Sequence, residues 1–179
     1  GEHRIASIVF LEVLGTDDSL LTSGPEEFAR ALDALVRAAQ GLHGSSSVQF
    51  LYTDVIADGV KLIATAGAPI STVNDDEAAL RYAVEIVHGD PFGQLKGGVN
   101  SGRIFAGFLG SPSRYTYTVM GDPVNLSARL MAHADPGQVV VSTDVVTRSK
   151  AEVASRELPP FLVKGKSKPV TAVVVDEVS

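Results

Sequence analysis

The sequence contains no cysteine and no tryptophan, and aromatic residues make up only 6% of its 179 residues. The absence of cysteine excludes disulfide bonds, thiolate metal ligands and a cysteine nucleophile. The four histidines are His3, His43, His88 and His133. They are scattered without the spacing of zinc ligands, so no zinc site is expected. Hydrophobic residues nevertheless reach 45%, which is enough for one well-formed core.

Positive charge is also scarce. The chain has 15 Lys and Arg residues and 21 Asp and Glu residues, which gives a net charge of -6. A general nucleic-acid surface needs clustered basic residues, so nucleic acid is not an expected partner. No membrane segment is expected either, since the apolar run at 5–14 is short, contains Glu12 and lacks a basic leader. These absences favour a cytoplasmic protein. The length predicts a single domain over residues 1–179, and the start at Gly1 rather than Met suggests a fragment of a larger multidomain protein.

The periodicity of apolar residues predicts alternating strands and helices. We expect strands at 5–14, 48–54, 59–66, 138–142 and 170–175, a strand pair within 95–109, and helices at 25–40, 75–87, after Asp122 and after Thr143. Thr22 or Ser23 is expected to start the helix at 25–40, and Asn74 to cap the helix at 75–87. This order indicates an α+β fold with a ferredoxin-like core, a mainly antiparallel sheet with helices packed on one face.

The segment 117–129 is the most informative part of the chain. Asp122 can cap a helix that accepts Pro123 in its first turn, and Asn125 and Arg129 then share one helix face. An apolar stripe should run beside them at helical spacing, formed by Val124, Ala128 and Met131. Two strong donors beside a buried seam suit a phosphorylated ligand. The alternative is an ordinary solvated pair on a helix surface.

The neighbouring segments carry a family resemblance. Gly98-Val-Asn-Ser-Gly102 runs on to Gly107 and Gly110, and the chain continues through 115–129, 134–143 and 161–170, the last with Lys164-Gly-Lys. Together these segments resemble a class III nucleotidyl cyclase homology domain, the family of adenylate and guanylate cyclases. The resemblance covers nearly the whole chain and implies the same ferredoxin-like core.

The resemblance also implies a chemistry, in which the ribose 3′-hydroxyl attacks the α-phosphate of a purine nucleotide such as ATP and pyrophosphate leaves. In this family the site forms between two homology domains, and the resemblance implies the same arrangement here. By resemblance, Asn125 would orient the ribose, Arg129 would stabilise charge on the α-phosphate, Lys164 would contact the terminal phosphates and Thr118 could bond the purine edge. The alternatives are a strand residue at Thr118 and a solvated hairpin rim at Lys164. Ile56 stands where the family has an adenine-reading Lys, so a preference for adenine is weakly supported.

The metal set implied by the family is incomplete. Mg²⁺ or Mn²⁺ would be held by two carboxylates, the first of which corresponds to Glu12 in place of Asp, a weaker fit to tight octahedral geometry. The second position holds Val60, which cannot bind a metal. Asp58 is a possible substitute, although Asp58-Gly59 is also a strong hairpin signal. The metal ions are therefore expected to come mainly from a partner domain, and the isolated domain is expected to be inactive.

Three hypotheses follow. The first is one half of a cyclase that converts ATP to cyclic AMP with a metal-bearing second cyclase domain, as in the second domain of tandem proteins like soluble adenylate cyclase. The second is a silent regulatory module that binds nucleotide or bicarbonate. The third is an active homodimer in which Glu12 and Asp58 hold metal.

Overall fold

The computed structural model describes residues 1–41, 47–57, 59–165 and 167–179. Its centre is an eight-stranded sheet with the order β2-β3-β1-β4-β6-β8-β7, and β5 pairs with β4 outside this path. All strand pairs are antiparallel except β4 with β6. The predicted α+β fold with a mainly antiparallel sheet is confirmed. The elements are β1 (Glu2–Leu14), α1 (Thr16–Ser23), α2 (Pro25–Gly41), β2 (Val48–Ile56), β3 (Gly59–Ala66), α3 (Asp75–His88), β4 (Lys96–Ser111), β5 (Arg114–Met120), α4 (Asp122–Ala132), β6 (Val139–Ser142), α5 (Thr143–Arg148), β7 (Val153–Glu157) and β8 (Ala172–Val178).

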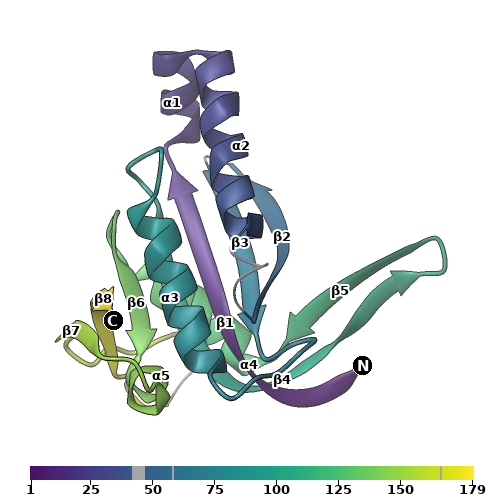
Figure 1. Ribbon diagram of the computed structural model, residues 1–179, viewed down its shortest axis with the longest axis vertical. Helices are drawn as coiled ribbons and strands as arrows, with labels where there is room; N and C mark the ends of the chain where they lie inside the picture. The colour runs from purple at the N-terminus through teal and green to yellow at the C-terminus, as the bar shows by residue number, and fades with distance from the viewer. Residues whose placement is uncertain (42–46, 58, 166) are drawn as a thin grey trace.

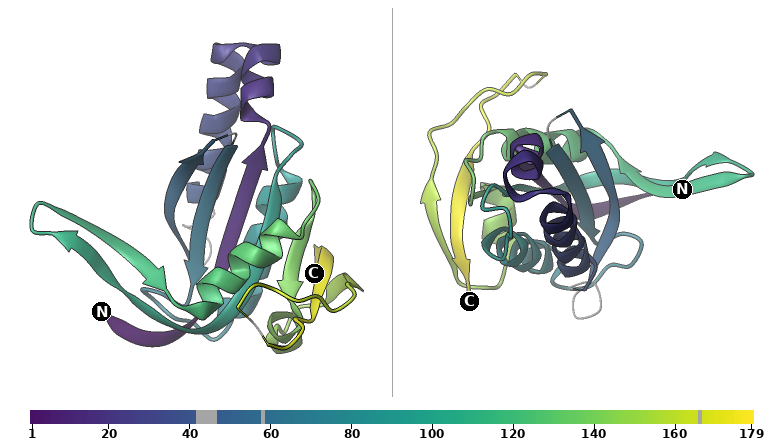
Figure 2. Two further views of the ribbon diagram at one scale, coloured as in Figure 1. Left: turned by 180° about the vertical axis from the view of Figure 1, so that it is seen from behind. Right: turned by 90° about the horizontal axis from the view of Figure 1, so that it is seen from above.

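Alternate residues of β1 divide the core between the two faces of the sheet. Val9, Leu11 and Val13 pack in one cluster with the buried residues of α2 and α3, so these two helices lie together on one face as expected. Ile8 and Phe10 point to the other face and pack with Met131 of α4. Figure 2 shows α4 on this opposite side, where it crosses β1 and β4.

Several element boundaries differ from the sequence expectations. Thr22 and Ser23 belong to α1, and Gly24, with φ +84°, separates this helix from α2. Asn74 does occupy the N-cap position of α3, but its side chain makes no capping hydrogen bond. The N-cap of α4 is Gly121 rather than Asp122, because the carbonyl of Gly121 accepts the first helical hydrogen bonds, at 3.1 Å and 3.3 Å.

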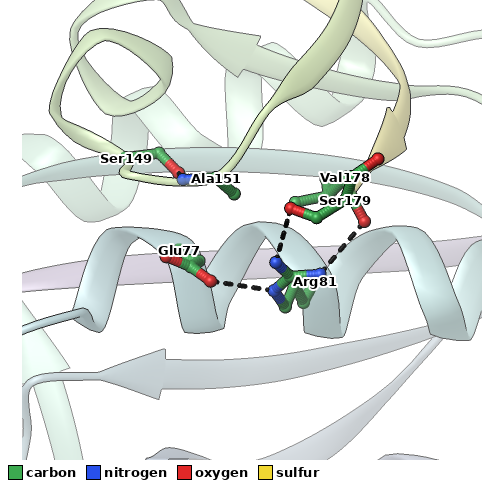
Figure 3. Close-up of polar contacts among 6 residues, drawn as sticks. All are labelled: Glu77, Arg81, Ser149, Ala151, Val178 and Ser179. Carbon is green, nitrogen blue, oxygen red and sulfur yellow. Dashed lines mark hydrogen bonds and ion pairs between the residues drawn. The ribbon is translucent and has the colours of Figure 1, made fainter.

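One hairpin extends from this body. The β4–β5 hairpin projects away from the sheet as a long two-stranded arm (Figure 1). On the body itself, Arg81 of α3 is bound to the end of β8: it donates to the carbonyl oxygens of Val178 and Ser179, at 3.0 Å and 2.7 Å (Figure 3). Among the described residues, no helix has the length and apolar character needed to cross a membrane.

Candidate active site on helix α4 and strand β1

Helix α4 lies directly on the sheet because glycine leaves room for its backbone. A Cβ atom added at Gly98 of β4 would lie 2.3 Å from the Met131 nitrogen and 2.4 Å from the Ser127 carbonyl oxygen. The buried hydroxyl of Ser127 lies 2.7 Å from the Ile8 carbonyl oxygen and 3.0 Å from that of Gly98, within hydrogen-bond distance of both. The centre of α4 is therefore fixed to β1 and β4 at once.

The first turn of α4 is held in a similar way. A Cβ atom at Gly102 would lie 2.6 Å from Pro123 Cγ, so this turn also rests against β4. Asn100, which is 5% exposed, donates from Nδ2 to the Pro123 carbonyl oxygen at 3.0 Å. Gly121 has φ +137°, a value that an L side chain rarely adopts, and this sets the direction of entry into the helix. The position of the helix is thus determined at two places along β4.

The packing of α4 leaves one narrow edge of the helix uncovered. Val124, Ala128 and Met131 pack against the sheet, as the sequence predicts. Leu126 and Leu130 pack against a third cluster formed with β6, β8 and the segment before β8. Asn125 is exposed and Arg129 is half-buried between these two seams. The predicted pair therefore lies along this uncovered edge between the two apolar seams, with Arg129 more buried than Asn125.

The turn that contains Lys164 lies against this edge. Gly165 has φ +85°, and a Cβ atom built on it would lie 3.9 Å from both terminal nitrogens of Arg129. The same segment is anchored by Phe161, whose ring lies 3.8 Å, centroid to centroid, from that of His133 just beyond α4. The structure thus brings Arg129 and the Lys164 turn together. We call Asn125, Arg129 and Lys164 the α4 edge.

Thr118 lies on β5, the strand that leads into α4. It is half-buried on β5, paired across the strands with Gly107, and precedes Gly121. Thr118 thus lies three residues before Gly121, the N-cap of α4, whereas the Lys164 turn lies near Arg129, one helical turn beyond Asn125. Ile56, at the end of β2, is half-buried opposite Gly59.

Glu12 lies between two lysines. It lies opposite Lys61 on β3 and opposite Lys96 on β4. Lys61 Nζ is 3.5 Å from Glu12 Oε1, and Lys96 Nζ is 3.5 Å from Oε2, so each carboxylate oxygen faces its own ammonium group. The side chains of Glu12 and Lys96 are 10% and 13% exposed. We call this group the lysine-bridged carboxylate.

The second carboxylate position contributes no ligand. Val60 is 6% exposed and packs in the same core cluster as Leu11 and Val13, next to α2 and α3. Asp58, proposed from the sequence as a possible substitute, lies outside the described residues. Within the described part of the chain, no group of three or more His, Asp or Glu side chains is placed to hold a metal ion.

Comparison with known proteins assigns the fold to a family. The family model for the adenylate and guanylate cyclase catalytic domain matches residues 2–176. The chain belongs to this family. An adenylate cyclase of Mycobacterium tuberculosis is 28% identical over 172 residues, which cover 90% of this chain and 37% of that protein. This cyclase domain thus spans little more than a third of the length of that curated relative.

Solved cyclase structures share the whole fold. The guanylyl cyclase Cya2 superposes with a TM-score of 0.81 at 23% identity, covering 100% of this chain and 95% of that one. The guanylate cyclase domain of RhGC from Catenaria anguillulae, solved in complex with GTP, gives a TM-score of 0.82 at 20% identity over 100% of both chains. At these identities the likeness establishes the fold alone.

Cyclase domains generally use divalent metals, and the residues that the structure describes around Glu12 and Val60 do not fit one. A divalent cation beside Glu12 would meet two ammonium groups, and Val60 offers no oxygen. Sequence reasoning missed Lys61 and Lys96, although both lie on strands that it predicted; their closeness to Glu12 depends on the register of β3 and β4 with β1. It also missed Ser127 as the residue that fastens α4, for which helical spacing from Val124 and Met131 was the available signal.

Proposed function

We propose that this domain supplies the α4 edge of a composite cyclase site, and that a second cyclase domain supplies the metal-binding carboxylates. The substrate would be ATP and the products cyclic AMP and pyrophosphate. The observation that carries the proposal is the meeting of Arg129 with the Lys164 turn on a helix fixed to the sheet. The M. tuberculosis relative named adenylate cyclase supports ATP as the substrate.

Each residue of the α4 edge has a distinct part in this scheme. The Asn125 amide, which is exposed, would hold the ribose ring so that its 3′-hydroxyl lies in line with the α-phosphate. Arg129 would stabilise the charge that grows on the α-phosphate oxygens, since a guanidinium stays protonated and can donate two parallel hydrogen bonds. Lys164 would contact the terminal phosphates that leave as pyrophosphate. Outside the α4 edge, Thr118 of β5 would contact the purine.

The partner surface proposed here includes the β4–β5 arm. Its apolar side chains are exposed, with Phe108 at 71%, Leu109 at 48% and Tyr115 at 59%. Phe108 and Tyr117 contact each other in a T-shaped arrangement, with ring centroids 5.3 Å apart. An exposed apolar group on a projecting hairpin suits burial against another domain. The partner would be a second cyclase domain, in the same parent chain or as a second copy.

A second candidate is a regulatory domain without catalysis, which binds nucleotide or bicarbonate. The lysine-bridged carboxylate and the buried Val60 favour it, because both count against a metal on this chain. They equally disfavour an active homodimer that uses Glu12 and Asp58. Reconstitution separates the candidates, since only the half-enzyme gains turnover when a metal-bearing cyclase domain is added.

The test measures cyclic AMP by chromatography for the isolated domain and for the domain mixed with a carboxylate-bearing cyclase domain. We expect no Mn²⁺-dependent turnover alone, and turnover in the mixture. Asn125→Ala and Arg129→Ala should each lower that turnover by about 100-fold or more, the usual cost of losing a transition-state donor. Arg30→Ala, on an exposed position of α2, is the matched control. Robust activity of the pure domain would refute the half-enzyme, and unchanged turnover in both variants would exclude these residues from the mechanism.

A further inference from the structure

In the lysine-bridged carboxylate, ammonium groups of the protein lie beside a carboxylate that could otherwise bind a metal cation. Lys61, Glu12 and Lys96 lie side by side on three adjacent strands, β3, β1 and β4, and their side chains share the sheet face that carries α4. Both carboxylate oxygens have a positive group at 3.5 Å. The negative charge that would attract a divalent ion is therefore already compensated by the protein.

The neighbouring charges explain how this group is stable without a metal. Asp54 of β2 is exposed and lies opposite Lys61, so the row reads Asp54, Lys61, Glu12, Lys96, with alternating sign across four strands. Lys61, with a side chain 32% exposed, has an acidic residue on both sides, whereas Lys96, which is 13% exposed, has one. Opposite charges placed directly across neighbouring strands stabilise a sheet.

The two ammonium groups retain donors for another ligand. Each carries three N–H groups, of which Glu12 can engage one. The 3.5 Å separations are also longer than the 2.7–2.9 Å that is usual for charge-assisted hydrogen bonds, so neither lysine is tightly bound to the carboxylate. An anion with several oxygen acceptors can therefore bridge Lys61 and Lys96 without removing either from Glu12.

We propose that Lys61 and Lys96 replace the divalent cation at this position, and that the site binds a polyphosphate anion directly, in the absence of metal. The proposal rests on the proposed function only in taking phosphate compounds as the ligand class. It concerns a different set of side chains from the α4 edge, so each can fail without the other.

The experiment applies two probes to the 179-residue protein, without a partner domain. Mn²⁺ alone is titrated and followed by electron paramagnetic resonance, and inorganic tripolyphosphate is titrated in EDTA by calorimetry. We expect no saturable Mn²⁺ binding, and tripolyphosphate binding that weakens with added salt. Lys61→Met and Lys96→Met should each weaken tripolyphosphate binding by about tenfold, the loss expected for one charge-assisted hydrogen bond.

Controls separate this site from the other basic groups. Lys150→Met, a change at an exposed lysine outside this row, should have little effect. Arg129→Ala should leave this binding in place, so its loss in that variant would assign the anion to the α4 edge and overturn the proposal. Glu12→Gln should strengthen tripolyphosphate binding, because it removes a competing negative charge. Saturable Mn²⁺ binding that Glu12→Gln abolishes would overturn the proposal, as would tripolyphosphate binding indifferent to both lysines. Circular dichroism checks folding, and Lys61→Met, the more exposed substitution, keeps the test available if Lys96→Met unfolds.

Discussion

Replacing Gly98 by alanine should displace α4 and so test how this helix is held. The added Cβ would lie 2.3 Å from the Met131 nitrogen, 2.4 Å from the Ser127 carbonyl oxygen and 2.8 Å from the Met131 Cα. These are backbone atoms of a helix, which cannot rotate away as a side chain can. Ordinary contact begins at about 3.5 Å, so α4 must retreat by roughly 1 Å.

This displacement of α4 should lower the free energy of unfolding, and it should lower the turnover of the reconstituted pair more strongly. Overpacking of this kind costs about 1–3 kcal/mol, and stretching the Ser127 hydroxyl from the Ile8 carbonyl adds about 1 kcal/mol. A total of about 2–4 kcal/mol should lower the melting temperature by about 5–15 °C for a domain of this size. A shift of about 1 Å in a positioning helix can cost about 100-fold in rate, so turnover of the reconstituted pair should fall further than stability suggests.

Gly97 provides the matched control in the adjacent position of β4. A Cβ there would point to the other face and meet side-chain atoms, Leu11 Cδ2 at 3.1 Å and Val139 Cγ2 at 3.4 Å. Such atoms can move by a few tenths of an ångström, so Gly97→Ala should cost far less. Thermal unfolding and urea unfolding measure both variants. Equal stability of Gly97→Ala and Gly98→Ala would show that α4 is not packed on β4 at the distance described here.

Two further predictions concern the helices on the other face. Burial raises the pKa of Tyr82, whose hydroxyl donates to the Ala39 carbonyl at 2.9 Å, so the folded state keeps the phenol neutral where the unfolded chain ionises. The contribution of this neutral phenol to the free energy of unfolding is complete below the ordinary tyrosine pKa of about 10, and it decreases as the pH rises above that value. Tyr82→Phe should thus cost about 1 kcal/mol at pH 7 in urea unfolding and lose less stability than the parent between about pH 10 and 11; identical pH profiles would contradict this assignment. Arg81→Met removes the two hydrogen bonds to Val178 and Ser179. Because the site is exposed, this change should lower the free energy of unfolding by only roughly 1 kcal/mol and should make amide exchange in β8 faster. Unchanged exchange in β8 would show that these two hydrogen bonds do not hold the strand in place.

The sequence predicts those elements whose pattern is local and strongly periodic. Helix α3 shows its buried stripe directly, because Tyr82 and Ile86 recur at helical spacing. Helix α1 has no such stripe: Leu20 and Leu21 are adjacent in the sequence and are 39% and 83% exposed. Its hydrophobic pattern therefore does not predict a helix. Strand β7 stands at the end of the sheet order beside β8, and its residues are mostly exposed. Its existence depends on a distant strand rather than on its own sequence.

The candidate site likewise has one part that the local sequence predicts and another part that it does not. Asn125 and Arg129 share a helix face because they are four residues apart, and this spacing is visible in the sequence. The closeness of Gly165 to Arg129 requires the chain to return to α4 after β6, α5 and β7, and no local pattern encodes this. The lysines beside Glu12 depend on the registers of two strand pairs, and a slip of one residue would place them on the other face.

The two halves of the site determine what kind of pair this domain can complete. A two-fold dimer of identical chains repeats every contact, so in the proposed arrangement each of its interface sites would join one α4 edge to one lysine-bridged carboxylate. Both sites would then lack metal ligands in the same way. A pair with a carboxylate-bearing domain instead has one site with a complete set and one site that contains Lys61 and Lys96. Turnover of such a pair should therefore depend on Arg129 and be indifferent to Lys61→Met, while tripolyphosphate binding without metal should show the opposite dependence. Arg129→Ala and Lys61→Met, each measured by both assays, therefore test the role proposed for the α4 edge independently of the role proposed for the lysine-bridged carboxylate.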